Sequence, residues 1–236
     1  HDMMVMNLWG SDDLVVSSWS DQDLKLFQST ESFYANSSPS MSIPLKLIGP
    51  NSLASGDIDS DGLEDIVVAC HDGLEILFNT GYSPFLDSND TYTLHLPGGN
   101  FTYVVVGNFN VGHEQANNRS VALDIAVINQ TSNRLEIYHN QEGEEAFDSS
   151  NKKSLDPAGG QVIWLGTGLI DDDDLPDLVT VTQDGIITVY FQGLGYEKGF
   201  DQSDKMVIEL EDNLTAATLG DIDDDGRSEI AIMSSS

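Results

Sequence analysis

The stretch GDIDSDGLEDIVVA, residues 56–69, decides how this chain can fold. An acidic nine-residue loop, 57–65, runs directly into a β-branched apolar segment, and a near copy, GDIDDDGRSEIAI, occupies residues 220–232. Both loops carry aspartate at positions 1, 3 and 5, glycine at position 6 and an acid at position 9. Glycine permits a tight curl, which turns the three carboxylates towards one point. We therefore expect each loop to lead into a β-strand and to gather negative charge.

These loops have the donor set of a Ca²⁺ site. Clustered carboxylates repel one another without a cation, and hard oxygen ligands suit Ca²⁺. The carbonyl at position 7 is expected to face inwards, and the acid at position 9 to close the shell. The predicted ligands are Asp57, Asp59, Asp61, Leu63 and Asp65 in the first loop, and Asp221, Asp223, Asp225, Arg227 and Glu229 in the second.

Two other interpretations compete with this one. An EF-hand loop needs Glu at position 12 and flanking helices, whereas position 12 is Val68 in one copy and Ile232 in the other, both inside strand-like runs. The pattern excludes an EF-hand. A solvated acidic turn without metal is the other alternative, and the second copy, with the same flanking segments, makes it the less favoured one.

The loop recurs in weaker form along the chain. Successive loop ends lie 52 to 59 residues apart, at Asp13, Asp65, Asp124, Asp177 and Glu229. Spacing of this size is typical of a repeat architecture. Apolar runs separated by turn signals such as Asp72-Gly73 follow the loop ends, and further short runs precede them, for example 45–48 and 52–55. No segment has a sustained helical period.

Each repeat thus predicts about four short strands, which is one blade of a β-propeller. We predict an all-β fold, a β-propeller of four-stranded antiparallel blades in a single domain over residues 1–236. The acidic loop should join the first and second strands of a blade. Four repeats are full and the fifth is partial, at approximately 1–50, 51–100, 101–160, 161–213 and 214–236.

The pattern apolar-Gly-Asp-x-Asp-x-Asp-Gly-x-x-Asp-apolar resembles the FG-GAP/VCBS repeat of integrin α-subunit propellers and related lectin-like propellers. The match is specific at residues 56–81 and 220–232, moderate at 166–193, and weak at 5–28 and 107–140. The resemblance implies that the loops bind Ca²⁺ and that the fold serves adhesion and ligand binding more often than catalysis. It also implies a parent propeller of about seven blades.

The loop that ends at Asp177 departs from this pattern. Leu169 stands at position 1 and Asp174 replaces the glycine, while Asp171, Asp173 and Asp177 keep positions 3, 5 and 9. We expect a weaker metal site there, or a shifted register that uses Asp172 and Asp174.

Two further repeats have lost most of the predicted ligands. Before Asp124, Asn108 and Asn110 replace two aspartates, and an insertion through 112–120 follows. The first repeat keeps only Asn7, Gly10 and Asp13. Both repeats are expected to be free of metal.

The composition narrows the range of partners. The chain of 236 residues has 40 acids against 9 bases and a net charge of −31, which repels nucleic acid and anionic membranes and favours cations and basic partners. It has no transmembrane span, so this segment is not expected to insert into a membrane. Nine scattered basic residues offer no cluster of the kind that a polysaccharide lyase needs.

Six of the fifteen asparagines are N-glycosylation sequons, where chance would give about two or three. They are predicted to lie in turns or hairpins and to carry glycans, at Asn36, Asn89, Asn100, Asn118, Asn129 and Asn213. Together with calcium loops, they favour a secreted or cell-surface location.

The favoured function is a non-enzymatic extracellular module that binds a protein or glycan ligand. One alternative is a structural repeat unit of an extracellular fibre or surface assembly, and another is the calcium-bearing propeller of a polysaccharide-degrading enzyme. The last repeat has no third or fourth strand. Remaining blades of the same protein, or neighbouring copies, are therefore expected to cover residues 229–233.

Overall fold

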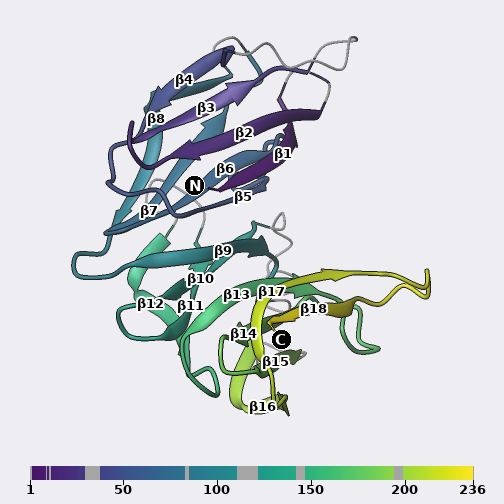
Figure 1. The fold of residues 1–236 in the computed structure, drawn as a ribbon. Coiled ribbons are helices and arrows are strands. Elements are labelled where there is room, and N and C mark those ends of the chain that lie inside the picture. Colours follow the sequence, from purple (N-terminus) through teal and green to yellow (C-terminus); the bar gives the residue numbers. More distant parts are fainter. Residues whose placement is uncertain are drawn as a thin grey trace. The chain divides into compact units, whose positions relative to one another are not determined.

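The computed structural model describes residues 2–8, 10, 12–29, 38–82, 85–110, 122–141, 147–193 and 199–235. Across these ranges the chain is all β, with strands β1 to β18 and no helix (Figure 1). There are four four-stranded sheets and one two-stranded sheet, with antiparallel pairing. The all-β prediction and the prediction of four strands in each full repeat are confirmed. Within the same ranges, no helix could cross a bilayer.

Residues 1–104 form one compact unit. Its two sheets follow chain order, β1-β2-β3-β4 and β5-β6-β7-β8. The strands are β1 (Met3–Asn7), β2 (Asp12–Ser18), β3 (Asp23–Phe27), β4 (Met41–Pro44), β5 (Ser52–Gly56), β6 (Asp65–Cys70), β7 (Gly73–Asn79) and β8 (Leu86–His95). Val15 and Leu24 of the first sheet share a buried cluster with Ile66 and Leu77 of the second. Burial of each such side chain stabilises the fold by about 1.5–3 kcal/mol relative to exposure.

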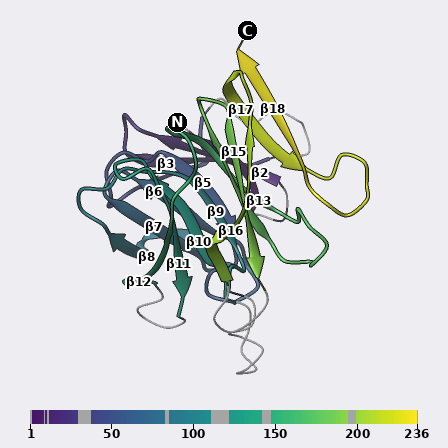
Figure 2. The same cartoon turned by 90° about the horizontal axis from the view of Figure 1, so that it is seen from below.

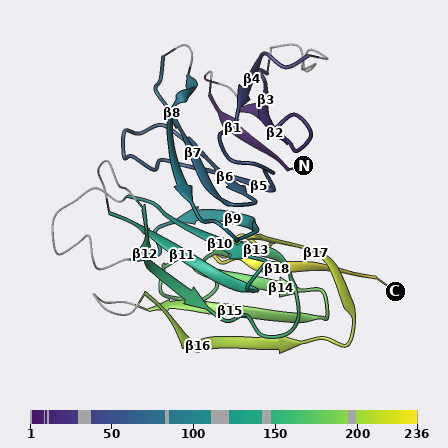
Figure 3. The same ribbon diagram turned by 90° about the vertical axis from the view of Figure 1, so that its left-hand side faces the viewer.

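Residues 105–236 form the second unit, and the boundary falls within β9. The sheets are β9-β10-β11-β12, β13-β14-β15-β16 and β17-β18 (Figures 2 and 3). The strands are β9 (Phe101–Gly107), β10 (Asp124–Asn129), β11 (Arg134–Asn140), β12 (Phe147–Leu155), β13 (Val162–Gly168), β14 (Asp177–Thr182), β15 (Ile186–Gly193), β16 (Gly199–Glu209), β17 (Asn213–Gly220) and β18 (Glu229–Ser235). Val179, Val189 and Leu214 form a buried cluster against which Ile230 packs, so the two-stranded sheet lies on its four-stranded neighbour.

In the second, third and fourth repeats, the second strand is the most completely buried one. β6 and β14 are buried along their whole length, and β10 is buried except at its last residue. A strand covered on both faces needs continuous apolar residues rather than alternation. In β18, the matching strand of the last repeat, Ile232 is 40% exposed and Met233 is 63% exposed. This apolar strand therefore lacks cover among the residues described.

One predicted strand is wrong. The run at 45–48 was expected to form a strand, but the fourth strand of the first sheet is β4, which ends at Pro44. Leu45 and Leu47 are nevertheless buried, in a connection rather than a strand. The backbone N–H groups of Lys46 and Leu47 donate to the carboxylate of Glu75, at 2.8 and 3.0 Å, instead of to a neighbouring strand. Apolar content alone could not reveal that partner.

Candidate metal centres

The two complete acidic loops join the first and second strands of their repeats, as predicted. Loop 57–65 lies between β5 and β6, and loop 221–229 lies between β17 and β18. Strand pairing places Gly56 opposite Asp65 and Gly220 opposite Glu229. Each loop is thus closed at its base by a β-ladder, which holds its two ends together.

Three carboxylates meet in each loop. Asp57, Asp59 and Asp61 each offer an oxygen within 4.8 Å of the others. The matching residues of the second loop, Asp221, Asp223 and Asp225, do the same. All six side chains are exposed except Asp57, which is half-buried. Among the described residues, these are the two groups of acidic, His or Cys side chains that approach one another so closely.

Left-handed backbone at two positions produces the curl. Position 4 has φ of 65° at Ser60 and 66° at Asp224, and position 6 has φ of 90° at Gly62 and 92° at Gly226. Glycine adopts such angles without steric cost, and a short polar residue tolerates them. The glycine at position 6 therefore has the role that the sequence pattern predicted.

The first aspartate of each loop also holds the curl. The Asp57 carboxylate accepts hydrogen bonds from the backbone N–H groups of Asp61 and Gly62, both at 3.0 Å. The matching bonds to Asp221 in the second loop measure 3.1 and 2.9 Å. Each carboxylate oxygen retains a further lone pair, so these bonds leave acceptor capacity for a cation.

The electrostatics favour a cation in the first loop. Asp59 is exposed at its surface but partly shielded from water by the curl of the loop. This desolvation, followed by the charges of Asp61 and Asp57, raises the pKa of Asp59 above its ordinary value. A divalent ion would remove that repulsion. Carboxylate oxygens in a compact loop are the ligands that hard cations take, so the donor set fits such an ion. The backbone carbonyls of Leu63 and Arg227 remain predicted ligands.

The acids at position 9 lie apart from the three-carboxylate groups and bond to backbone. Asp65 is fully buried; its Oδ2 accepts from the N–H of Ile58 and its Oδ1 from the N–H of Asn79, both at 2.8 Å. Glu229 accepts from the N–H of Ile222 at 2.7 Å. These acids connect the loop to its strands, and their predicted metal ligation stays a prediction.

The same connection occurs in the other three full repeats. Buried Asp13, Asp124 and Asp177 each accept one amide from the start of the preceding loop and one from the end of the third strand or just beyond it. The donors are Leu8 and Ser29, Phe109 and Asn140, and Ile170 and Gln192, respectively. Sequence reasoning missed this role. The sequence did contain a signal for this role: position 9 keeps its Asp even in repeats that have lost the other acids of the loop.

Loop 169–177 differs from the complete loops. Its acids Asp171, Asp173 and Asp177 are described, yet they do not form a group of the kind seen in loops 57–65 and 221–229. The Asp171 carboxylate accepts from the N–H of Asp173 at 3.1 Å, and Asp174 takes the left-handed position 6 with φ of 59°. The Asp172 carboxylate pairs with the guanidinium of Arg227.

The two repeats expected to lack metal are only partly described. Asn110 Nδ2 donates to Asp124 Oδ1 at 3.4 Å, and the insertion at 112–120 falls outside the described residues. In the first repeat, Gly10 donates its N–H to Asn7 Oδ1 at 2.8 Å. Neither of these contacts gathers carboxylates.

The sequons occupy several kinds of position. Asn36 and Asn118 lie outside the described residues. Asn129 ends β10 and is half-buried, with its Nδ2 3.2 Å from Glu136 Oε1. Half-buried Asn100 is in a loop and accepts from Asn51 Nδ2 at 3.1 Å.

Two sequons are not in turns, which corrects the prediction. Asn213 begins β17, and Asn89 lies inside β8; both are exposed. Asn89 is accessible because β8 is the outer strand of its sheet, and its N–H bonds to the Asp87 carboxylate at 2.9 Å rather than to the neighbouring strand.

A small open pocket of about 190 Å³ in the first unit was not predicted. It is lined by Trp19, Gln22, Ile48, Gly49 and His71. The Trp19 and His71 rings meet edge to face with centroids 6.1 Å apart, and Trp19 stays 48% exposed. These residues come from separate turns and a connection, so no local motif joins them.

Comparisons with known proteins were made with this geometry in hand. No protein-family model matches the chain. No curated protein matches it either. Among solved structures, it is similar to the crystal structure of BBS1N in complex with ARL6DN, soaked with mercury. That match has 14% sequence identity and a TM-score of 0.38, and it covers 97% of this chain and 90% of the other. Function must therefore be inferred from the residues of this chain.

Proposed function

We propose that the chain is a calcium-stabilised, non-enzymatic β-propeller module that binds a protein or glycan ligand outside the cell. The observation that carries the proposal is the convergence of three carboxylates in each of two loops of the same design. Hard oxygen donors in a compact, glycine-containing loop suit Ca²⁺. In this proposal Asp57, Asp59 and Asp61 hold one ion, and Asp221, Asp223 and Asp225 hold another.

The ions would be structural rather than catalytic. Both loops join neighbouring strands, so an ion there stabilises the folded state and not the unfolded one. Millimolar extracellular calcium and six sequons agree with a glycosylated protein that is secreted or displayed at the cell surface.

The propeller is proposed from the sheets themselves. Four sheets have four antiparallel strands in chain order, and the described acidic loops stand between the first and second strands. This is the topology of propeller blades and agrees with the FG-GAP/VCBS resemblance. Further blades of the same protein, or a neighbouring copy, would cover the exposed residues of β18.

A fibre or surface assembly is a second candidate. The exposed apolar strand β18 favours it, because an uncovered strand edge pairs readily with another chain.

Thermal melting combined with calorimetry tests the proposal. Calcium should raise the melting temperature by many degrees, and calorimetry should detect two strong sites. An unchanged melting temperature after removal of metal would contradict the structural role of calcium. A screen for polysaccharide turnover separates a binding module from an enzyme, and light scattering separates a discrete module from an assembly.

A further inference from the structure

Loops 169–177 and 221–229 contact each other, although they belong to different sheets. The N–H of Ser228 donates to the carbonyl of Leu169 at 2.7 Å. Next to it, Gly168 lies so close to Ser228 that an added Cβ would be 2.6 Å from its Oγ. The base of one loop therefore rests directly on the start of the other.

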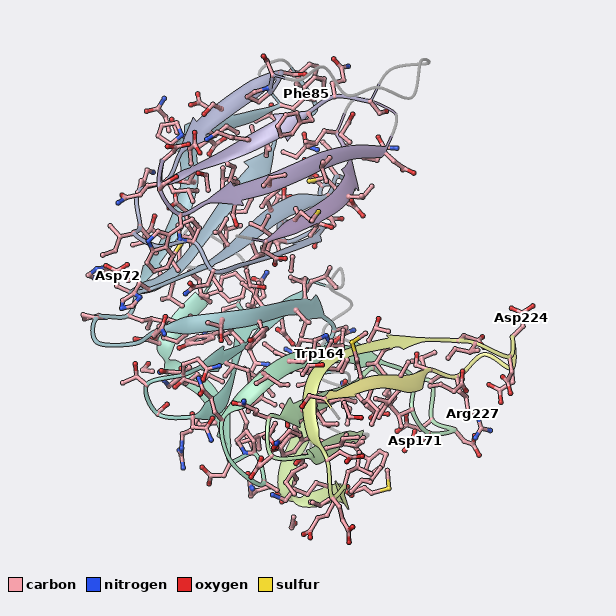
Figure 4. All side chains as sticks on the ribbon, in the orientation of Figure 1. Asp72, Phe85, Trp164, Asp171, Asp224 and Arg227 are labelled. Atoms are coloured by element: carbon pink, nitrogen blue, oxygen red, sulfur yellow. The ribbon has the colours of Figure 1, made fainter. Side chains whose placement is uncertain are left out.

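An ion pair joins the same two loops farther out. The guanidinium of Arg227 pairs with the carboxylate of Asp172, and Figure 4 shows Arg227 extending towards the loop that carries Asp171. Loop 169–177 has four consecutive aspartates, 171–174. Among the described residues, Arg227 is the cation that forms an ion pair with this run. Its charge offsets part of the repulsion among these four aspartates.

Arg227 occupies position 7 of its own loop. The backbone at that position follows the curl around the three carboxylates, since the N–H of Arg227 donates to Asp225 at 2.9 Å. The side chain of the same residue reaches the neighbouring loop. One residue thus belongs to both loops.

We propose that Arg227 couples the two loops, so that calcium binding in loop 221–229 orders loop 169–177 through the Arg227–Asp172 ion pair. An ion held by Asp221, Asp223 and Asp225 would fix the backbone at position 7, and the Arg227 guanidinium would then hold Asp172. Loop 169–177 is stabilised in this way without a strong cation site of its own. The inference rests on the calcium site proposed above for loop 221–229.

The first acidic loop offers a natural control. Position 7 there is Leu63, whose side chain packs near Gly81 and carries no charge. Loop 57–65 should therefore respond to calcium independently of any arginine.

Hydrogen–deuterium exchange of the 1–236 protein, with and without calcium chloride, tests the coupling. In the wild type, calcium should slow exchange in 57–65, 221–229 and 169–177. In Arg227→Met, which keeps the backbone and most of the stem, calcium should still protect 57–65 and 221–229. Exchange in 169–177 should become about two- to fivefold faster than in the wild type with calcium, as suits an exposed ion pair. Arg227→Lys should restore part of the protection, and Leu63→Met should change nothing in 169–177.

Each other outcome overturns the proposal in a distinguishable way. If 169–177 keeps its calcium protection in Arg227→Met, the ion pair does not carry the coupling and the proposal is wrong. If calcium protects 221–229 but not 169–177 in the wild type, the coupling fails while the calcium proposal stands. If calcium protects none of the three loops, the calcium proposal fails and the coupling with it. If Arg227→Met does not fold, Asp172→Asn removes the other partner of the ion pair and is measured by the same exchange experiment.

Discussion

Asp65 Oδ1 accepts a hydrogen bond from the backbone N–H of Asn79 at 2.8 Å, across 14 positions of sequence. The other oxygen of the same carboxylate accepts from Ile58. One buried side chain thus fixes the start of the acidic loop to the end of the third strand. Because the same arrangement recurs at Asp13, Asp124 and Asp177, it is a structural element of the repeat whether or not the loop binds metal.

Replacing Asp65 with asparagine should destabilise the protein by about 1–3 kcal/mol, even without metal. The amide keeps one acceptor oxygen but turns an NH₂ group towards one of the two buried N–H donors, which is left unpaired. Urea unfolding in metal-free buffer at pH 8, above the Asp65 pKa of about 7, measures the loss for the ionised carboxylate. Glu64→Gln, at the exposed neighbouring position, is the matched control and should leave the midpoint nearly unchanged.

The metal-free protein should be more stable at pH 5 than at pH 8. Burial raises the pKa of Asp65 to about 7 and that of Asp177 to about 6, from 3.8. Because the folded state favours the protonated form of both acids, they add to the free energy of unfolding. This added stability is complete below pH 3.8 and is lost as the pH rises through 6 and 7. Each pKa unit corresponds to about 1.4 kcal/mol.

Urea midpoints at the two pH values measure this dependence, and Asp65→Asn should reduce it because one titrating group is gone. Saturating calcium should oppose the trend, since a cation favours the charged carboxylates. A higher midpoint at pH 8 in metal-free buffer would show that the buried acids are ionised in the fold without cost.

Asp59→Ala and Asp223→Ala should each remove one strong calcium site and leave the other intact. Each substitution deletes one of three converging carboxylates in its own loop. Calorimetry should count one strong site in either single variant and none in the double variant. At a calcium concentration of about 100 times the dissociation constant, each lost site removes about 2.7 kcal/mol of stabilisation. Glu64→Gln, which removes an exposed carboxylate of the same loop that is not among the three converging ones, should keep both sites.

Any binding by loop 169–177 should rank third in affinity. Leu169 supplies no carboxylate, Asp174 replaces the glycine, and Asp172 is engaged by Arg227. Fewer free ligands lower the affinity. Calorimetry of the Asp59→Ala, Asp223→Ala double variant isolates this loop, and submicromolar binding there would contradict the ligand count.

The local pattern predicted most of the fold and the three converging carboxylates. Apolar runs of strand length and the loop spacing are local properties, so β5, β6 and the loop between them could be read from residues 52–70. The role of Asp65 could not be predicted from the sequence. An acid at position 9 suits a metal ligand and an acceptor of backbone hydrogen bonds equally well. The run 45–48 misled for a related reason. Its leucines are apolar, but the backbone N–H groups of Lys46 and Leu47 donate to Glu75, which is distant in sequence. The Arg227–Asp172 pair joins different repeats, which no motif within one loop can reveal.

The 1–236 chain should self-associate through β18, and Ile232→Lys should reduce that association. Ile232 and Met233 are exposed in a strand whose counterparts β6 and β14 are wholly buried. An uncovered apolar strand pairs with another strand, whereas lysine on an edge opposes pairing. Light scattering over a range of concentrations measures the shift towards monomer. Ile222→Lys is the control: Ile222 is more exposed, at 71%, but lies in the acidic loop and not in the strand. A wild-type chain that stays monomeric at every concentration would show that the exposed strand needs no partner in solution.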